Sequence, residues 1–128
     1  MLYCKTEVQP SQIQGLGLFA LEPIPAGTLV LRSDKQFDKH INPGDVASFP
    51  KTAQEFLATY GWRYPDGTIA VTLDNGRFIN HSATPNLIVT FDPEASSYAA
   101  RDIAAGEELT EDYSSFDPDF ASYASELR

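Results

Sequence analysis

The chain has 128 residues, of which 42% are hydrophobic and 12% aromatic, so its composition is that of one folded domain and not of a disordered segment. The formal net charge of −9 disfavours direct nucleic-acid binding, which usually requires a basic surface. An acidic surface can steer a lysine-rich peptide toward the protein, or it can simply keep the protein soluble.

No apolar run approaches the roughly 20 residues that span a bilayer, and the N-terminus lacks the pattern of a secretory signal. We therefore expect a cytoplasmic protein that has no membrane partner. Cys4 is the only cysteine, and His40 and His81 are the only histidines. No intrinsic metal site is expected, because structural zinc requires four Cys or His ligands.

Glycine and proline recur at short intervals, which is typical of a chain rich in short strands. We expect the first strands at residues 2–8, 18–21 and 28–32, with a turn at 23–27. A hairpin is predicted from strands 87–91 and 97–100, and another short strand at 108–111.

One short helix is predicted near residues 51–60. Ala53, Phe56, Leu57 and Tyr60 recur at helical spacing in this segment, and Gly61 follows it. The result is a mostly β domain that carries a single helix. The last stretch, 114–128, is either a docked tail or a frayed terminus.

Three segments could carry chemistry. The run Gly15-Leu16-Gly17 lets a backbone pass close to a ligand, although taken alone a β-turn explains it better. RFINHSATPN, at residues 77–86, is dense in hydrogen-bonding side chains, which could also serve only a turn. The third segment, GEELTEDY, ends at Tyr113, which alone would be an ordinary core or rim residue.

Together, in this order and spacing, the three segments resemble the motifs of SET-domain protein-lysine methyltransferases. The family patterns are RFxNHSCxPN and GEELTxDY, and the resemblance covers residues 3–116. It implies a single domain over 1–128 with a short tail at 117–128. The implied fold is the β-clip of small curved sheets, in which a C-terminal pseudoknot brings the NHS segment to Tyr113. The chain looks like the minimal viral or bacterial type.

The resemblance also implies the methyl donor, S-adenosylmethionine, and the residues around it. The backbone of Gly15, Leu16 and Gly17 should meet the methionine part. Asn80 should bind through its side chain, and His81 mainly through its backbone at the adenine. An aromatic side chain of the tail should stack on the adenine; of Phe116 and Phe120 we prefer Phe116.

Tyr113 matches the family's catalytic tyrosine. Methyl transfer from a sulfonium to an amine is an in-line displacement, so alignment is most of the work. An apolar channel and a nearby sulfonium both lower the pKa of a lysine ammonium, and no dedicated general base is then required. Tyr113 can orient the amine, or it can only shape the pocket.

Two departures affect the lysine side. Residues 31–35 lack the family's Tyr-x-Gly element, and Tyr60, Trp62 or Tyr64 could replace that aromatic side chain. Glu111 occupies a position where an aromatic or Ile is common; it could point outward, or it could hold the substrate amine, and on the second reading we assign it to the substrate channel. The family's Cys-rich zinc segment does not follow the core, so a monomer or a homodimer must complete the channel without it.

The sequence thus predicts an enzyme that methylates the ε-amine of a lysine in a histone or another protein. The alternative is a non-catalytic module of the same fold that binds a peptide or protein.

Overall fold

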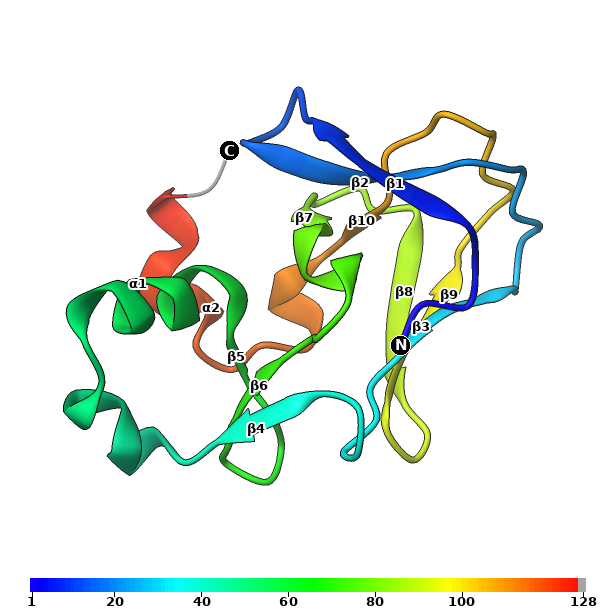
Figure 1. Ribbon diagram of the computed structural model, residues 1–128. Coiled ribbons are helices and arrows are strands. Elements are labelled where there is room, and N and C mark those ends of the chain that lie inside the picture. Colours follow the sequence, from blue (N-terminus) through cyan, green and yellow to red (C-terminus); the bar gives the residue numbers. More distant parts are fainter. Residues whose placement is uncertain (127–128) are drawn as a thin grey trace.

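The computed structural model describes residues 1–126 and consists mainly of short strands in small sheets (Figure 1). Four sheets have the strand orders β1-β2, β10-β7, β3-β9-β8 and β4-β6-β5. None of the helices within residues 1–126 is long and apolar enough to cross a membrane. The strands are β1 (Thr6–Pro10), β2 (Leu16–Ala20), β3 (Leu29–Arg32), β4 (Lys39–Ile41), β5 (Trp62–Arg63), β6 (Ile69–Val71), β7 (Asn80–His81), β8 (Leu87–Phe91), β9 (Ala95–Ala99) and β10 (Thr110–Glu111).

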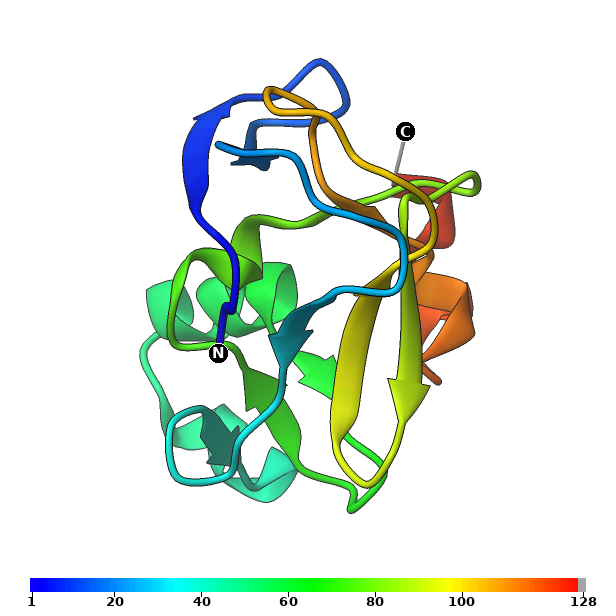
Figure 2. The ribbon, with the colours of Figure 1, turned by 90° about the vertical axis from the view of Figure 1, so that its right-hand side faces the viewer.

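The antiparallel sheet β3-β9-β8 forms one side of the molecule, as Figure 2 shows. Strand β8 has the predicted bounds, and β9 begins two residues earlier than expected, at Ala95. The central strand β9 is buried along most of its length because it has a neighbour on each side.

The hairpin of β1 and β2 packs its apolar face onto the main core. The first strand was predicted over 2–8, but the ordered pairing runs from Thr6 to Pro10, and Leu2 instead forms an isolated bridge with Leu31. The turn between the strands contains Gly15 with a φ of +49°, a conformation that side chains with a Cβ disfavour. The fully or nearly fully buried core residues are Leu18, Ala20, Ile24, Val30, Ile79, Leu87, Ala99, Ile103 and Leu109.

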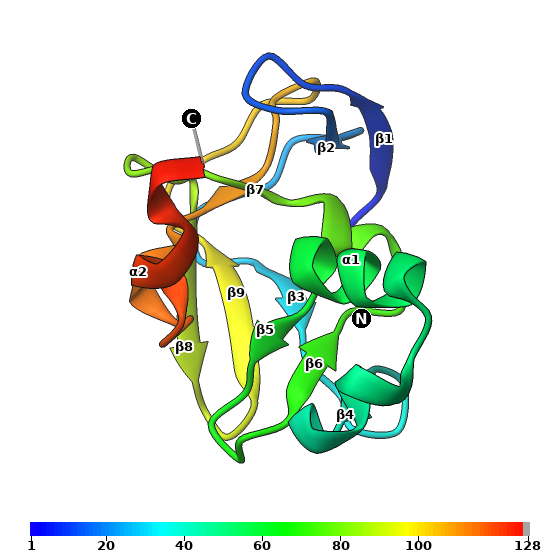
Figure 3. The same ribbon diagram turned by 90° about the vertical axis from the view of Figure 1, so that its left-hand side faces the viewer.

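The helix α1 (Lys51–Tyr60) has the predicted position and covers the sheet β4-β6-β5 (Figure 3). It buries Leu57 and ends at Gly61, whose backbone N–H donates to the Leu57 carbonyl at 2.8 Å. The three strands of this sheet are only two or three residues long. They escaped the sequence analysis because such short strands carry no readable alternation of apolar and polar residues.

The segment that contains β10 contacts both the β1-β2 hairpin and β7. Phe19 of β2 pairs with Glu108, and β10 then runs parallel to β7, with Thr110 opposite Asn80 and Glu111 opposite His81. Asn86 anchors this pairing: its Nδ2 donates to the Glu108 carbonyl at 2.8 Å, and its Oδ1 accepts from the Thr110 N–H at 2.9 Å. The family resemblance implied this juxtaposition of the NHS segment with the residues before Tyr113.

The tail is docked through the last described residues and is not frayed there. A 3₁₀ helix (Tyr113–Ser115) leads into α2 (Phe120–Tyr123) and a final 3₁₀ turn (Ala124–Glu126). The expectation of a single helix therefore missed α2, which is one turn long and too short to show a helical period. Leu127 and Arg128 of the predicted tail lie outside the described residues.

Candidate active site

The turn that precedes β2 is tied to the NHS segment through Asn80. Asn80 Nδ2 lies 3.2 Å from the Gln14 carbonyl oxygen, 3.0 Å from that of Leu16 and 2.9 Å from Glu108 Oε2. The described residues donate no hydrogen bond to its Oδ1. Two predicted cofactor segments, far apart in the sequence, therefore meet, and acceptor oxygens converge between them.

Gly17 is closely packed at the same place. A Cβ at this position would lie 2.5 Å from Glu108 Oε2 and 3.1 Å from Ser11 Cβ. Ser11 Oγ in turn donates to the Glu108 carboxylate at 2.7 Å. The glycine thus lets the strand approach a carboxylate whose oxygens face Asn80.

His81 and Tyr113 are held together by a backbone contact. The Tyr113 N–H donates to His81 Nδ1 at 3.1 Å, so that ring nitrogen carries no proton in this arrangement. The His81 ring also packs against Phe120, with centroids 5.1 Å apart. The histidine predicted to act through its backbone thus also positions the start of the tail.

The Tyr113 hydroxyl is a committed donor. It donates a short hydrogen bond to the Ile79 carbonyl. Burial raises the pKa of Tyr113, and the carboxylates of Glu111, Asp117 and Glu108 raise it further. The phenol therefore stays protonated in any ordinary buffer, and it can position a reactant but is a poor base.

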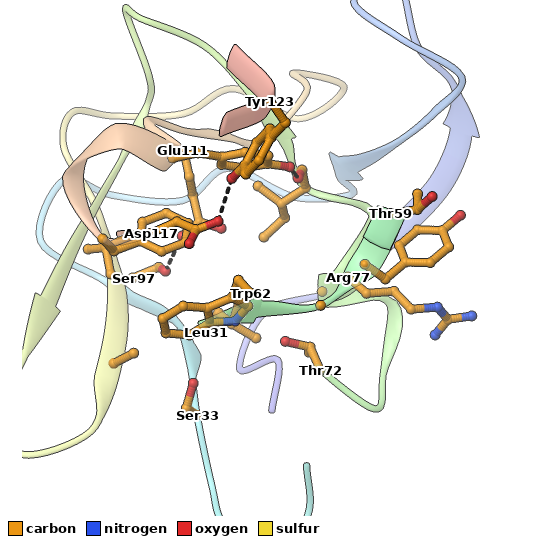
Figure 4. A pocket seen from close by; sticks show the side chains of 18 of the residues that line it. Leu31, Ser33, Thr59, Trp62, Thr72, Arg77, Ser97, Glu111, Asp117 and Tyr123 are labelled. Atoms are coloured by element: carbon orange, nitrogen blue, oxygen red, sulfur yellow. Dashed lines mark hydrogen bonds between the residues drawn. The ribbon is translucent and has the colours of Figure 1, made fainter. Parts of the chain in front are cut away.

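A cavity of about 240 Å³ opens beside this hydroxyl (Figure 4). Tyr113, Glu111 and Asp117 line it together with Gln14, the residue whose carbonyl contacts Asn80. Figure 4 shows the carboxylates of Glu111 and Asp117 on the same side of the cavity, opposite Arg77. The hollow therefore connects the loop before β2 with the acidic residues.

Glu111 points inward. Only 7% of the residue is exposed, and its Oε2 accepts from Ser97 Oγ at 2.9 Å. Burial raises the pKa of Glu111 to about 7, and the bond from Ser97 opposes that shift. Neither Glu111 nor Asp117 forms an ion pair with a basic residue in the described part of the chain. Asp117 instead accepts a short hydrogen bond from the Tyr123 hydroxyl.

Aromatic side chains form another part of the wall. Trp62 and Phe116 pack edge to face with ring centroids 5.1 Å apart, and Phe116 lies 5.7 Å from the Tyr113 ring. Of the three candidates for the missing channel aromatic, Trp62 and Tyr60 line the cavity. Tyr64 does not line this cavity, and its hydroxyl donates to Glu94.

The comparisons with known proteins agree with this geometry. The family model described as SET domain matches residues 15–114. The chain belongs to the SET domain family.

Curated relatives of this SET domain are histone methyltransferases. It is 32% identical over 111 residues to the "Histone-lysine N-methyltransferase, H3 lysine-4 specific" of Yarrowia lipolytica, covering 80% of this chain and 9% of the relative. It is 30% identical over 129 residues to the "Histone-lysine N-methyltransferase SETMAR" of Mus musculus, covering 88% and 41%. The chain thus spans less than half of each of these relatives.

The solved structures show the same fold. One chain of a humanized mutant of the Chaetomium thermophilum Polycomb Repressive Complex 2, bound to the inhibitor GSK126, superposes with a TM-score of 0.66 at 23% identity. That match covers 93% of the SET domain described here and 16% of the other chain.

Two residues of the SET domain cavity were missed by the sequence analysis. Asp117 is 6% exposed and lies in the tail, where no spacing pattern marks a single buried carboxylate. Arg77 lines the cavity and has a buried Nε without a hydrogen-bond partner among residues 1–126. Its place at the start of the RFINHS segment was the available signal.

Proposed function

We propose that this SET domain transfers a methyl group from S-adenosylmethionine to the ε-amine of a lysine in a protein. The observation that carries the proposal is the environment of Tyr113. A hydroxyl held as a donor beside His81 lies at a cavity lined by Glu111 and Asp117, and the charge of Glu108 also raises its pKa. Both expected ligands carry positive charge near their reacting atoms, and such a cavity favours them.

The residues present fit the methyl donor. Asn80 Oδ1 and the neighbouring carbonyl oxygens of Gln14 and Leu16 offer acceptors for an α-amino group, and Gly17 leaves room for a close approach. When bound, the donor supplies an electrophilic methyl group on a sulfonium. The contact between His81 and Phe120 favours Phe120 as the adenine-stacking residue, because Phe116 packs against Trp62 and Tyr113 instead.

Tyr113 serves orientation and not proton transfer in this proposal. Its raised pKa keeps the hydroxyl protonated, and its bond to the Ile79 carbonyl fixes its direction. A fixed hydroxyl and a backbone carbonyl together give polar oxygens near the reacting atoms, where alignment governs the rate. Weak CH···O contacts to a polarised methyl group are a further use of these oxygens.

Glu111 holds the substrate ammonium in this proposal. A buried carboxylate without a counter-ion costs several kcal/mol, and a bound cation relieves that cost. The structure turns this carboxylate into the cavity, which is the orientation that such a role needs. The relatives named as histone methyltransferases make histone one candidate substrate, and another lysine-containing protein is the other.

The test has two stages. Calorimetry with S-adenosylhomocysteine measures cofactor binding, and labelled S-adenosylmethionine is then incubated with purified histones and with total cell lysate. Mass spectrometry of the labelled proteins reports the substrate and the number of methyl groups together. Tyr113→Phe is the control and should bind the cofactor without efficient transfer. Absence of cofactor binding would refute the enzyme and favour the non-catalytic module.

A further inference from the structure

Glu111 and Asp117 are the buried carboxylates that line the cavity, and of these two Glu111 is the one with an oxygen that accepts no hydrogen bond from residues 1–126. Its Oε2 accepts from Ser97, whereas Oε1 receives no hydrogen bond from any residue between 1 and 126. We propose that Glu111 accepts the proton of the substrate ammonium before methyl transfer. This inference rests on the proposed function, and it gives Glu111 a chemical step in addition to the binding of the amine.

The other carboxylates near Tyr113, those of Asp117 and Glu108, accept hydrogen bonds at both of their oxygens. Asp117 accepts from the Tyr123 hydroxyl at one oxygen and from the Asp119 N–H at the other. Glu108 accepts from Ser11 at both oxygens and from Asn80 at Oε2. A proton acceptor needs an unoccupied lone pair that faces the substrate. Of these carboxylates, Glu111 alone has an oxygen that accepts no hydrogen bond from residues 1–126.

Tyr113 cannot take the proton. Its hydroxyl already donates to Ile79, and the neighbouring carboxylates raise its pKa further above the ordinary value. A phenolate beside three carboxylates would add a like charge to a buried site. Orientation by Tyr113 and proton acceptance by Glu111 are thus separate roles for two residues of one cavity.

The affinity of Glu111 for protons suits the task. Burial raises its pKa to about 7, so near neutral pH a large fraction is charged and can accept a proton. A free lysine side chain, with a pKa of about 10.4, holds its proton roughly 10³-fold more tightly. Desolvation reduces this difference in proton affinity, because proton transfer converts a buried ion pair into a neutral amine and a neutral carboxylic acid.

None of the other titratable side chains described in the cavity forms an ion pair with Glu111. Arg77 is the only described cation among them, and its Nη1 is bound to the carbonyls of Leu73 and Asp74. Ser97 donates from the neighbouring strand β9, and its bond favours the charged form of Glu111. The cavity's other titratable groups are Tyr60, Arg77, Tyr113, Asp117, Tyr123 and Glu126.

The step balances as a proton transfer followed by substitution. An N–H bond of the ammonium breaks, its electron pair stays on nitrogen, and an O–H bond forms at Glu111 Oε1. The nitrogen lone pair then forms the C–N bond while the C–S bond of the donor breaks and its electrons return to sulfur. The product is a methylated ammonium, and Glu111 releases its proton to water, so one proton leaves per methyl group.

The first test is a titration that needs no turnover. Carbon-13 NMR of protein labelled at the glutamate carboxyl groups should show one resonance with a midpoint near pH 7, absent from Glu111→Gln. Addition of n-butylammonium, a mimic of the lysine side chain, should lower that midpoint, because a cation favours the carboxylate. A Glu111 midpoint near the ordinary value of 4.5, or no response to n-butylammonium, would overturn the inference.

The second test is the pH dependence of kcat/KM, with purified histones and total lysate protein as methyl acceptors. Wild-type activity should rise with pH to a plateau above about 7, because the charged form of Glu111 accepts the proton. Glu111→Gln should be about 10²-fold slower at pH 7 and should recover toward pH 10, where solvent removes the proton. Ser97→Ala should shift the acidic limb of the pH profile to higher pH, because it removes a donor that stabilises the Glu111 carboxylate.

Glu7→Gln, the same change at an exposed position of β1, is the matched control and should keep the wild-type profile. An equal loss in Glu111→Gln at every pH would mean that Glu111 only holds the amine, and the proton-acceptor role would be wrong. Wild-type protein that binds the cofactor but transfers no methyl group at any pH would refute the proposed function itself. The two failures are therefore distinguishable.

Discussion

Replacing Glu111 by Gln should make the protein more stable at pH 8. The change keeps the shape of the side chain and the acceptor for Ser97, and it removes a charge that has no ion-pair partner in residues 1–126. A carboxylate whose pKa is raised by folding favours the unfolded state once it ionises. Glu111 should therefore destabilise the wild-type protein at alkaline pH.

The magnitude follows from the two pKa values. The pKa of Glu111 is about 7 in the folded protein and 4.5 in its ordinary range. At 1.36 kcal/mol for each unit of pKa, the difference in stability is about 3 kcal/mol. The wild type keeps its full stability below about pH 4.5, loses this amount as the pH rises through about 7, and changes little above that.

Thermal and urea unfolding at pH 5 and pH 8 measure the effect. For 128 residues, the entropy of unfolding near the midpoint is about 270 cal/mol/K, so about 3 kcal/mol corresponds to a rise in Tm of about 11 °C at pH 8. At pH 5 the gap between Glu111→Gln and the wild type should shrink to about a quarter of this value.

Glu107→Gln provides a comparison of opposite sign. The bond from Arg101 lowers the pKa of Glu107 to about 2, so that variant should be less stable than the wild type at pH 7. If Glu111→Gln gave no gain at pH 8, or the same gain at pH 5 and pH 8, then the carboxylate would not be buried and charged as described. The reasoning about its cost would then be wrong.

Three further substitutions test the other half of the site. Tyr113→Phe should slow methyl transfer about 10²- to 10³-fold with cofactor affinity unchanged, as initial rates and calorimetry can measure. Gly17→Ala should cost about 1–3 kcal/mol in urea unfolding and weaken the cofactor, because its Cβ would lie 2.5 Å from the Glu108 carboxylate. Asn80→Asp should lower cofactor affinity at least about tenfold by calorimetry, since it loses the amide donors and sets a second carboxylate beside Glu108.

The sequence predicted those elements of the fold that have a recognisable local pattern. Strand β8 was predicted because Leu87–Phe91 flanks a turn as half of a hairpin, and helix α1 was predicted because Lys51–Tyr60 is long enough to show a helical period. The strands of the sheet β4-β6-β5 were not, because they form only through tertiary pairing. The shift of β1 has a similar cause: Leu2 pairs with a distant residue and leaves the hairpin to start at Thr6.

The site residues also fall into those that sequence motifs identify and those whose position depends on the tertiary structure. Motifs identified Asn80, His81 and Tyr113, and the structure brings them together through β7 and the segment after β10. The direction of Glu111 was left open, because a strand of two residues has no alternation that assigns a face. Asp117 could not be found from sequence, since its burial depends on how the tail folds back onto the cavity.

Trp62 gives the protein a built-in optical reporter. It is the only tryptophan of the chain, and it lines the cavity with its ring 5.1 Å from Phe116. Indole emission excited at long wavelength therefore arises from this wall alone. A cofactor or peptide that enters the hollow will change the polarity around one fluorophore, so its occupancy can be followed without an attached dye.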